Sequence, residues 1–184
     1  RDDSRKDPKV IEYLKSENRL ADKWFDSKYD YQTEIVDELT NQVPEEQISF
    51  PVSNNSYQYY QKINKEDQLS RYYRKDKNNN ETLYLDPNLK LKDQVYYSIG
   101  SVSPSPDNSL IAFTEDNNGR REYQIKILEP NSLKIVDESV ISASNNIVWF
   151  NDNKYILYLK KDSITLIADS VYLHKIGTKQ NEDI

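Results

Sequence analysis

The chain has 184 residues, of which 36% are hydrophobic and 30% charged, and its formal net charge is −6. An acidic chain offers no basic stripe that could release counterions from phosphates, which argues against nucleic acid as a partner. Cysteine is absent, so a disulfide framework and thiol chemistry are excluded. No apolar run is long enough to cross a membrane and no signal peptide is visible, so we expect a cytoplasmic protein without membrane contact.

The composition also indicates how a core can form and what the chain represents. Fifteen tyrosines and two tryptophans supply buried area although the mean hydropathy is −0.93, which favours a thin aromatic core over disorder. Methionine is absent and the first residue is Arg1, so we expect the chain to be a segment of a longer protein.

The first part of the chain has helical periodicity. Asp7 and Pro8 form an N-cap and a first-turn proline. An apolar stripe at helical spacing follows, made of Val10, Ile11, Tyr13 and Leu14. A second helix is predicted over Tyr29–Leu39, and Pro44 ends the helical part. We therefore expect an N-terminal helical arm over residues 1–46.

From Ile48 onward the apolar pattern changes to period two, which predicts strands. The first four candidates are Ile48–Val52, Tyr57–Lys62, Leu69–Arg74 and Glu81–Leu85. The links between them are rich in Asn, Ser, Asp and Lys, as turns are. The asparagines of Asn78–Asn80 are interpreted as a surface loop, with a low-complexity interaction tract as the alternative.

The fold prediction depends mainly on a repeat in the sequence. The pattern of Tyr96–Ile125 recurs about 45 residues later as Asn146–Asp162. Asp107-Asn108 aligns with Asp152-Asn153, and Ile111 and Phe113 align with Ile156 and Tyr158. A fixed period of this length is typical of repeat folds, and this one resembles the blades of a β-propeller. Asp107-Asn108 and Asp152-Asn153 should then occupy equivalent turns.

The predicted blades divide the rest of the chain. The second blade spans Tyr96–Glu138, and the third begins near Ile147 and continues through Tyr155–Lys160 and Val171–Ile176. Because closed propellers have about four to eight blades, residues 47–184 should form only part of one. The predicted fold class is mainly β, with an N-terminal α-helical arm and about three blades of antiparallel strands.

No known catalytic signature is present. The three glycines, Gly100, Gly119 and Gly177, are too far apart for a nucleophile elbow, a P-loop or a Rossmann turn. The single histidine, His174, lies in an apparent strand beside Lys175, so we expect a structural histidine bonded to backbone instead of a catalytic base. One histidine without cysteine does not make a zinc site. We assign no catalytic, cofactor-binding or metal-binding residue and expect no cofactor.

Several charged pairs and one tryptophan are candidate functional residues. The acidic pairs Asp2-Asp3, Glu45-Glu46 and Glu115-Asp116 could support glycosidic chemistry, but each is expected in a terminus or loop as solvated turn or cap residues. Arg120-Arg121 could clamp a carboxylate, but we expect the pair to be solvated or bonded to a neighbouring blade. Trp149 is expected in the core.

The N-terminal stretch resembles the oligopeptidase B group in the prolyl oligopeptidase family of serine peptidases. The residues that carry this resemblance are Asp2, Asp3, Arg5, Pro8, Val10, Ile11, Tyr13, Leu14, Glu17 and Asn18. It continues in order through Leu83–Asn88, Tyr96–Asn108, the Gly119, Arg121 and Tyr123 pattern, Trp149–Lys154 and Val171–Thr178. The match is loose over Tyr57–Asp76, and Ile11 replaces the more usual leucine.

The resemblance implies a parent enzyme with a seven-bladed propeller above an α/β-hydrolase domain. That enzyme would hydrolyse short peptides after Lys or Arg, its propeller would filter substrates, and the arm would pack on the downstream hydrolase domain. The Ser, Asp and His of the triad would lie downstream, so this segment should be inactive alone and could self-associate. The alternative is a propeller-like binding module without enzymatic activity.

Overall fold

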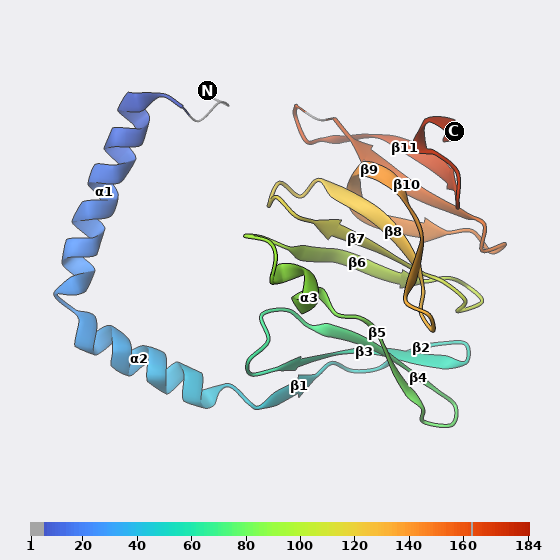
Figure 1. Ribbon diagram of the computed structural model, residues 1–184, viewed down its shortest axis with the longest axis horizontal. Coiled ribbons are helices and arrows are strands. Elements are labelled where there is room, and N and C mark those ends of the chain that lie inside the picture. Colours follow the sequence, from blue (N-terminus) through green and yellow to red (C-terminus); the bar gives the residue numbers. More distant parts are fainter. Residues whose placement is uncertain (1–5, 163) are drawn as a thin grey trace. The chain divides into compact units, whose positions relative to one another are not determined.

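The computed structural model describes residues 6–162 and 164–184 and divides into two compact units, one ending at Pro44 and one spanning Glu45–Ile184. The first unit consists of two helices, α1 (Pro8–Asp26) and α2 (Tyr29–Gln42) (Figure 1). The Asp7 side chain caps α1 by accepting a hydrogen bond from the Lys9 amide at 2.9 Å. Both predicted helices are confirmed, although α2 extends beyond the predicted Leu39.

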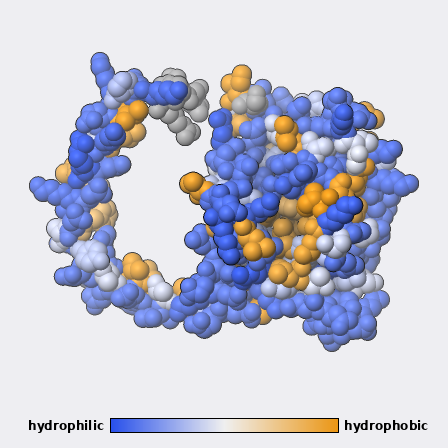
Figure 2. Space-filling model, viewed as in Figure 1, coloured by the Kyte–Doolittle hydropathy of each residue, from blue (hydrophilic) through white to orange (hydrophobic). Residues whose placement is uncertain are grey.

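Both helices keep their apolar side chains exposed. Neither α1 nor α2 buries a residue within the described structure. Val10 is 53% exposed and Leu14 is 54% exposed, and hydrophobic patches are visible along both helices in Figure 2. An amphipathic helix gains most of its stability from packing its apolar face, so this stripe is suited to a partner surface.

The second unit is built from antiparallel strands. Those of the first sheet are β1 (Glu46–Ile48), β2 (Val52–Asn54), β3 (Tyr57–Asn64), β4 (Arg71–Asp76) and β5 (Glu81–Leu85). Those of the second sheet are β6 (Ser98–Pro104), β7 (Ile111–Asp116), β8 (Tyr123–Glu129), β9 (Lys134–Trp149), β10 (Tyr155–Lys161) and β11 (Ala168–Lys175). A short helix, α3 (Pro87–Leu91), links the sheets, and a 3₁₀ turn, η1 (Gln180–Glu182), follows β11.

The first sheet has four strand positions, because β1 and β2 both pair with β3. The sequence predicts one strand over Ile48–Val52, but the structure has two short ones. Pro51 interrupts the ladder because proline has no amide hydrogen to donate. The Ser49 side chain fills the gap, since its oxygen accepts a hydrogen bond from the Gln61 amide at 2.9 Å.

The second sheet is one continuous meander in the order β6 to β11 (Figure 1). Its long strand β9 pairs with β8 at its beginning and with β10 at its end, so the second and third repeats share this strand. Ala143 has partners on both sides, Tyr123 and Lys160. Ser142 beside it has a φ of 56°, which bends the strand where one repeat passes into the next. The mainly β fold class with a helical arm is confirmed.

Two apolar clusters hold the second unit together. One lies within the second sheet and consists of Ala112, Ile125, Ile127, Val140, Ala143, Ile156 and Tyr158. The other joins the two sheets, because Tyr84 of β5 packs with Ile111, Phe113 and Leu128 of the second sheet. Adjacent sheets that bury side chains against one another in this way are the packing unit of a propeller.

Candidate functional site

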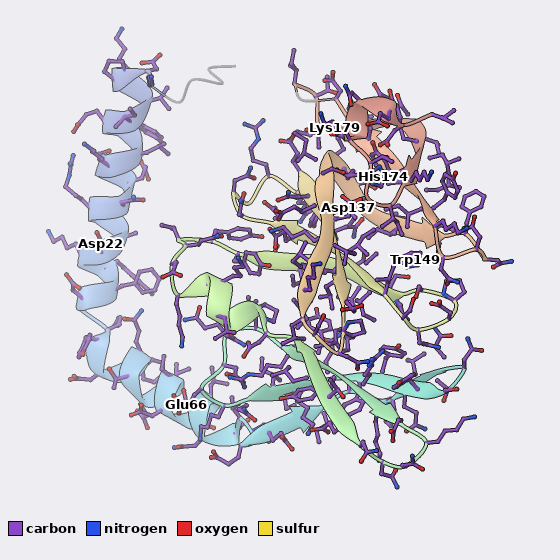
Figure 3. All side chains as sticks on the ribbon, turned by 45° about the vertical axis from the view of Figure 1, so that its right-hand side comes forward. Asp22, Glu66, Asp137, Trp149, His174 and Lys179 are labelled. Atoms are coloured by element: carbon purple, nitrogen blue, oxygen red, sulfur yellow. The ribbon has the colours of Figure 1, made fainter. Side chains whose placement is uncertain are left out.

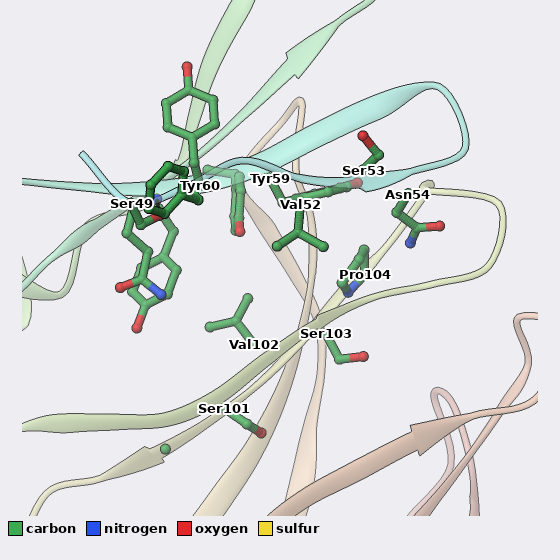
Figure 4. A pocket seen from close by; sticks show the side chains of 15 residues that line it. Ser49, Val52, Ser53, Asn54, Tyr59, Tyr60, Ser101, Val102, Ser103 and Pro104 are labelled. Atoms are coloured by element: carbon green, nitrogen blue, oxygen red, sulfur yellow. Dashed lines mark hydrogen bonds between the residues drawn. The ribbon is translucent and has the colours of Figure 1, made fainter.

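A pocket lies between β2 and β3 of the first sheet and β6 of the second (Figure 4). Its polar lining is uncharged and consists of four tyrosines together with Ser49, Ser53, Asn54, Gln61, Ser101 and Ser103. Val52 of β2 and Val102 of β6 face one another across the gap. The pocket can therefore contact a polar neutral chain through hydroxyl and amide groups, but it holds no charge that would select ions.

Strand β6 is fixed at this position by Gly100 and by contacts with β9. A Cβ atom on Gly100 would come within 2.6 Å of the Thr114 hydroxyl, so the close approach requires glycine. The Thr114 hydroxyl accepts a hydrogen bond from the Ser101 amide at 2.8 Å. The indole of Trp149, at the end of β9, donates to the Ser103 carbonyl at 3.0 Å. The first strands of successive repeats are therefore neighbours, as the inner strands of propeller blades are.

The predicted equivalence of the two Asp-Asn turns is confirmed. Asn108 and Asn153 both adopt left-handed backbone conformations, with φ values of 63° and 59°. Their amides close similar turns, donating to the Ser105 carbonyl at 2.9 Å and to the Phe150 carbonyl at 3.1 Å. In each turn the preceding aspartate accepts a hydrogen bond of 2.9 Å from the amide two residues later. Asparagine tolerates this backbone region better than most residues do.

A third turn, a two-residue hairpin that also holds an asparagine in the left-handed region, lies beside these two. Asn55, between β2 and β3, also has a positive φ of 51°, and its amide group donates to the Pro106 carbonyl at 2.6 Å. The Asp107 amide in turn donates to the Asn153 side chain at 3.0 Å. The three turns therefore form a connected row along one end of the repeats. The sequence repeat did not include Asn55, although its Ser-Asn-Asn-Ser context did predict a turn.

A buried arginine ties the first sheet to the second, and sequence reasoning missed it. Arg74 of β4 is 2% exposed and stacks on the Tyr57 ring at 4.3 Å. Its guanidinium donates to the Asn108 carbonyl at 2.9 Å and to the Asn131 side chain at 2.7 Å. Tyr59 adds a hydrogen bond of 2.8 Å to the Asn108 side chain. An arginine in a polar strand carries no local signal that distinguishes this role from a solvated position.

His174 lies in strand β11, as predicted, but its expected backbone partner is wrong. Both ring nitrogens contact carboxylates, Nε2 with Asp137 at 2.9 Å and Nδ1 with Asp183 at 2.6 Å. Figure 3 labels His174 and Asp137. The ring is fully buried. Burial would lower the pKa of His174, but the hydrogen bonds with the two carboxylates outweigh it, so the pKa is raised. A histidine enclosed in this way is not available as a base for a substrate.

The expectation of a solvated Glu115-Asp116 pair is wrong. Both residues end strand β7 and are buried, at 8% and 1% exposure. Glu115 pairs with Lys126 at 2.8 Å and accepts a hydrogen bond from the Tyr97 hydroxyl at 2.6 Å. The Asp116 carboxylate caps the following turn by accepting from the Arg121 amide at 2.8 Å. Acidic residues are buried only where such partners surround them: here Lys126 comes from β8, Tyr97 from the residue before β6, and Arg121 from the turn after β7.

Of the remaining candidates, Glu45-Glu46 is exposed as expected, but Glu46 begins strand β1 and is not in a loop. Asp2-Asp3 lies outside the described residues. The side chains of Arg120-Arg121 are exposed, and the Arg121 carbonyl accepts a hydrogen bond from Lys161 of the neighbouring repeat. Trp149 packs against the cluster of the second sheet, as predicted for a core residue.

Within residues 6–162 and 164–184, no group of three or more His, Cys, Asp or Glu side chains is arranged to hold a metal ion. No helix of the described chain is long and apolar enough to span a membrane.

Comparisons with known proteins agree in identifying one family. The family model described as "Prolyl oligopeptidase, N-terminal beta-propeller domain" matches residues 1–184. Dipeptidyl aminopeptidase BI from Pseudoxanthomonas mexicana is 27% identical over 100% of this chain and 28% of its own length. Protease 2 from Moraxella lacunata is 23% identical over 97% of this chain and 27% of its own length.

A solved structure shows the same architecture. Oligopeptidase B from Leishmania major superposes with a TM-score of 0.91 at 27% identity, covering 100% of this chain and 26% of that one. The chain thus spans 26% of the length of oligopeptidase B and 28% of the length of dipeptidyl aminopeptidase BI. Because the family match covers every residue, the chain belongs to the prolyl oligopeptidase family and corresponds to its N-terminal β-propeller domain.

Proposed function

We propose that this chain is the N-terminal propeller portion of a serine oligopeptidase that hydrolyses short peptides after Lys or Arg. The observation that carries the proposal is the whole-chain likeness to oligopeptidase B in both sequence and structure. The motifs that resemble this group, from Pro8 in the arm to Val171–Thr178, occur in the same order along the chain. In the proposed parent, the helical arm packs on a downstream hydrolase domain through its exposed apolar stripe.

The propeller's part in this proposal is to filter substrates by size. The first strands of neighbouring repeats lie side by side, and the pocket between β2 and β6 opens along them. An extended peptide can follow hydroxyl and amide groups of this kind, whereas a folded protein is too wide to enter a propeller channel. The lining carries no carboxylate, so we assign the preference for basic residues to the downstream domain.

We assign catalysis to a triad outside this chain. His174, the single histidine, is enclosed by two carboxylates and has no exposed surface. A triad histidine must exchange protons with a serine and a substrate, which this burial prevents. The 184-residue chain alone should therefore have no peptidase activity.

We also place the parent in the cytoplasm, a proposal that rests on the absence of cysteine.

The test is an assay of the full-length protein against short fluorogenic peptides ending in Arg, Lys or Pro. We expect turnover after Arg and Lys that a serine-directed inhibitor blocks, and no turnover by the 184-residue chain. Cleavage only after Pro would retain the peptidase and overturn the specificity. A full-length protein without any G-x-S-x-G segment and without activity would favour the alternative, a propeller-like binding module.

A further inference from the structure

The contacts of His174 constrain its protonation state. Asp137 Oδ2 lies 2.9 Å from the Nε2 atom, and Asp183 Oδ1 lies 2.6 Å from the Nδ1 atom. A neutral imidazole has one N–H donor and one lone pair, so one of these two carboxylates would face a lone pair at hydrogen-bond distance. An imidazolium donates from both nitrogens and satisfies both carboxylates.

The carboxylates are held as acceptors by their other partners. Asp137 accepts hydrogen bonds from the Ser139 amide at 2.9 Å and from the Ser139 hydroxyl at 2.8 Å, and it also accepts from the Gly177 amide. Asp183 accepts from the Tyr158 hydroxyl at 2.8 Å. Because these groups all donate to the two aspartates, both carboxylates act as acceptors in the cluster. The protons between the imidazole ring and the carboxylates therefore belong to His174.

The cluster joins three segments, and the one that holds Asp137 is distant in the sequence from the other two. Asp137 lies where β9 pairs with β8 and thus belongs to the second repeat, whereas His174 lies on β11 of the third repeat. Asp183 follows η1 and is adjacent to Ile184, whose backbone pairs with Leu173 at 2.8 and 3.1 Å. The cluster is therefore placed to fasten the segment after β11 to both repeats.

We propose that His174 stays protonated in the folded chain at neutral pH and that its proton is a lock joining Asp137 of the second repeat to Asp183 of the segment after η1. Loss of the proton leaves a lone pair facing a carboxylate and releases residues 177–184 from β11. The titratable groups that face the lock are Asp137 from β9, Asp183 and Tyr158 from β10.

The direction of the pH dependence follows from the two pKa shifts. The raised pKa of His174 contributes stability that is complete below its ordinary value of about 6.5 and is lost as the pH rises through the folded value. Burial raises the pKa of Asp137, but its hydrogen bonds with His174, Ser139 and Gly177 outweigh burial, so the pKa is lowered. Its contribution is complete above about 3.9 and is lost as the pH falls. The lock is therefore strongest between these two ordinary values.

The direct test is an NMR titration of the ring nitrogens in the 184-residue chain. Because His174 is the single histidine, its signals need no assignment. We expect both ring N–H groups and an imidazolium signal at pH values above the ordinary pKa of about 6.5. A neutral ring at pH 7, or titration at or below the ordinary value, would overturn the proposal.

The substitution Asp183→Asn keeps the contacts of residue 183 but removes the need for a proton on His174. Its amide can accept from Tyr158 through oxygen and donate to the lone pair of a neutral His174 through nitrogen, so the lock no longer needs a proton. The matched control is Asp169→Asn, an exposed aspartate on β11, the strand of His174, whose carboxylate accepts a hydrogen bond from its neighbour Ser170 at 2.7 Å.

Hydrogen exchange at the Leu173 and Ile184 amides measures the release of residues 177–184 from β11. In the unchanged chain and in D169N, we expect protection at these amides to fall about tenfold as His174 deprotonates, the loss expected for one charge-assisted hydrogen bond. In D183N the His174 midpoint should drop and the pH dependence of protection should disappear. Unchanged protection across the His174 titration in the original chain would refute the lock, and this measurement decides the question even if D183N does not fold.

Discussion

At the scale of single residues, Asn108 shows how one side chain serves both a turn and the contact between sheets. Its left-handed backbone conformation closes the turn between β6 and β7, with a φ of 63°. Its side chain accepts a hydrogen bond from Tyr59, and its carbonyl accepts one from Arg74, both on the first sheet. The local requirement is visible in the sequence, but the contacts with the first sheet are not.

Three substitutions should separate these roles. Asn108→Ala loses the hydrogen bond and strains the left-handed backbone, so we expect a loss of about 2 kcal/mol in the free energy of unfolding. Tyr59→Phe removes only the hydrogen bond and leaves a buried acceptor, which should cost about 1 kcal/mol. Asn108→Gly removes the bond but relieves the strain, so it should resemble Tyr59→Phe. Urea unfolding measures all three, and equal effects of N108A and N108G would contradict the strain argument.

At the scale of elements, β7 and β8 are joined by a largely buried ion pair. The side chains of Glu115 and Lys126 are 9% and 12% exposed, and their charged atoms are 2.8 Å apart. Burial would lower the pKa of Lys126, but its contacts with Glu115 and Glu138 outweigh burial and raise it. The buried position of Glu115 therefore depends on the strand beside it.

Removing one partner should cost more than replacing both. Lys126→Met keeps the aliphatic stem but leaves Glu115 without its cation, so we expect a loss of about 3 kcal/mol in the free energy of unfolding. The double substitution of Lys126→Met with Glu115→Gln removes both charges and keeps an acceptor for Tyr97, so it should recover a large part of that loss. A double variant that is no more stable than K126M would show that the unpaired Glu115 charge is not what destabilises K126M. Denaturant unfolding at neutral pH makes the comparison.

At the scale of the whole molecule, the helices α1 and α2 expose apolar side chains that elsewhere would form a core. Leu20 is 65% exposed and Trp24 is 60% exposed, in addition to the stripe of Val10 and Leu14. Exposed apolar surface of this kind recruits partners. In the proposed parent the partner is the hydrolase domain, and in the 184-residue chain alone a second copy of the chain can take its place.

We therefore predict that the 184-residue chain self-associates. Light scattering across a concentration series should show a mass above that of the monomer, and Leu14→Lys should shift the equilibrium toward monomer by placing a charge in the stripe. The matched control is Glu12→Lys, an exposed position of α1 whose neighbours at i+3 and i+4, Lys15 and Ser16, are polar, so it should change nothing. A monomer at all concentrations, or equal effects of the two lysines, would refute association through this stripe.

The sequence by itself determined the features that depend on neighbouring residues. The turn at Asp107-Asn108 and its repeat at Asp152-Asn153 could be predicted because their hydrogen bonds span two or three residues. The Asp7 cap and the change from helical to alternating periodicity near Pro44 are local for the same reason. The family resemblance followed from the order of such local motifs.

Only the tertiary structure decided which polar residues are buried and what they contact. His174 contacts Asp137 across 37 residues of sequence, and Arg74 contacts Asn108 across 34. Glu115 is buried because Lys126 of β8 and Tyr97, the residue before β6, both bond to it. No local pattern encodes these partners, because the burial of a charge depends on whether the stacked strands bring a compensating group to it.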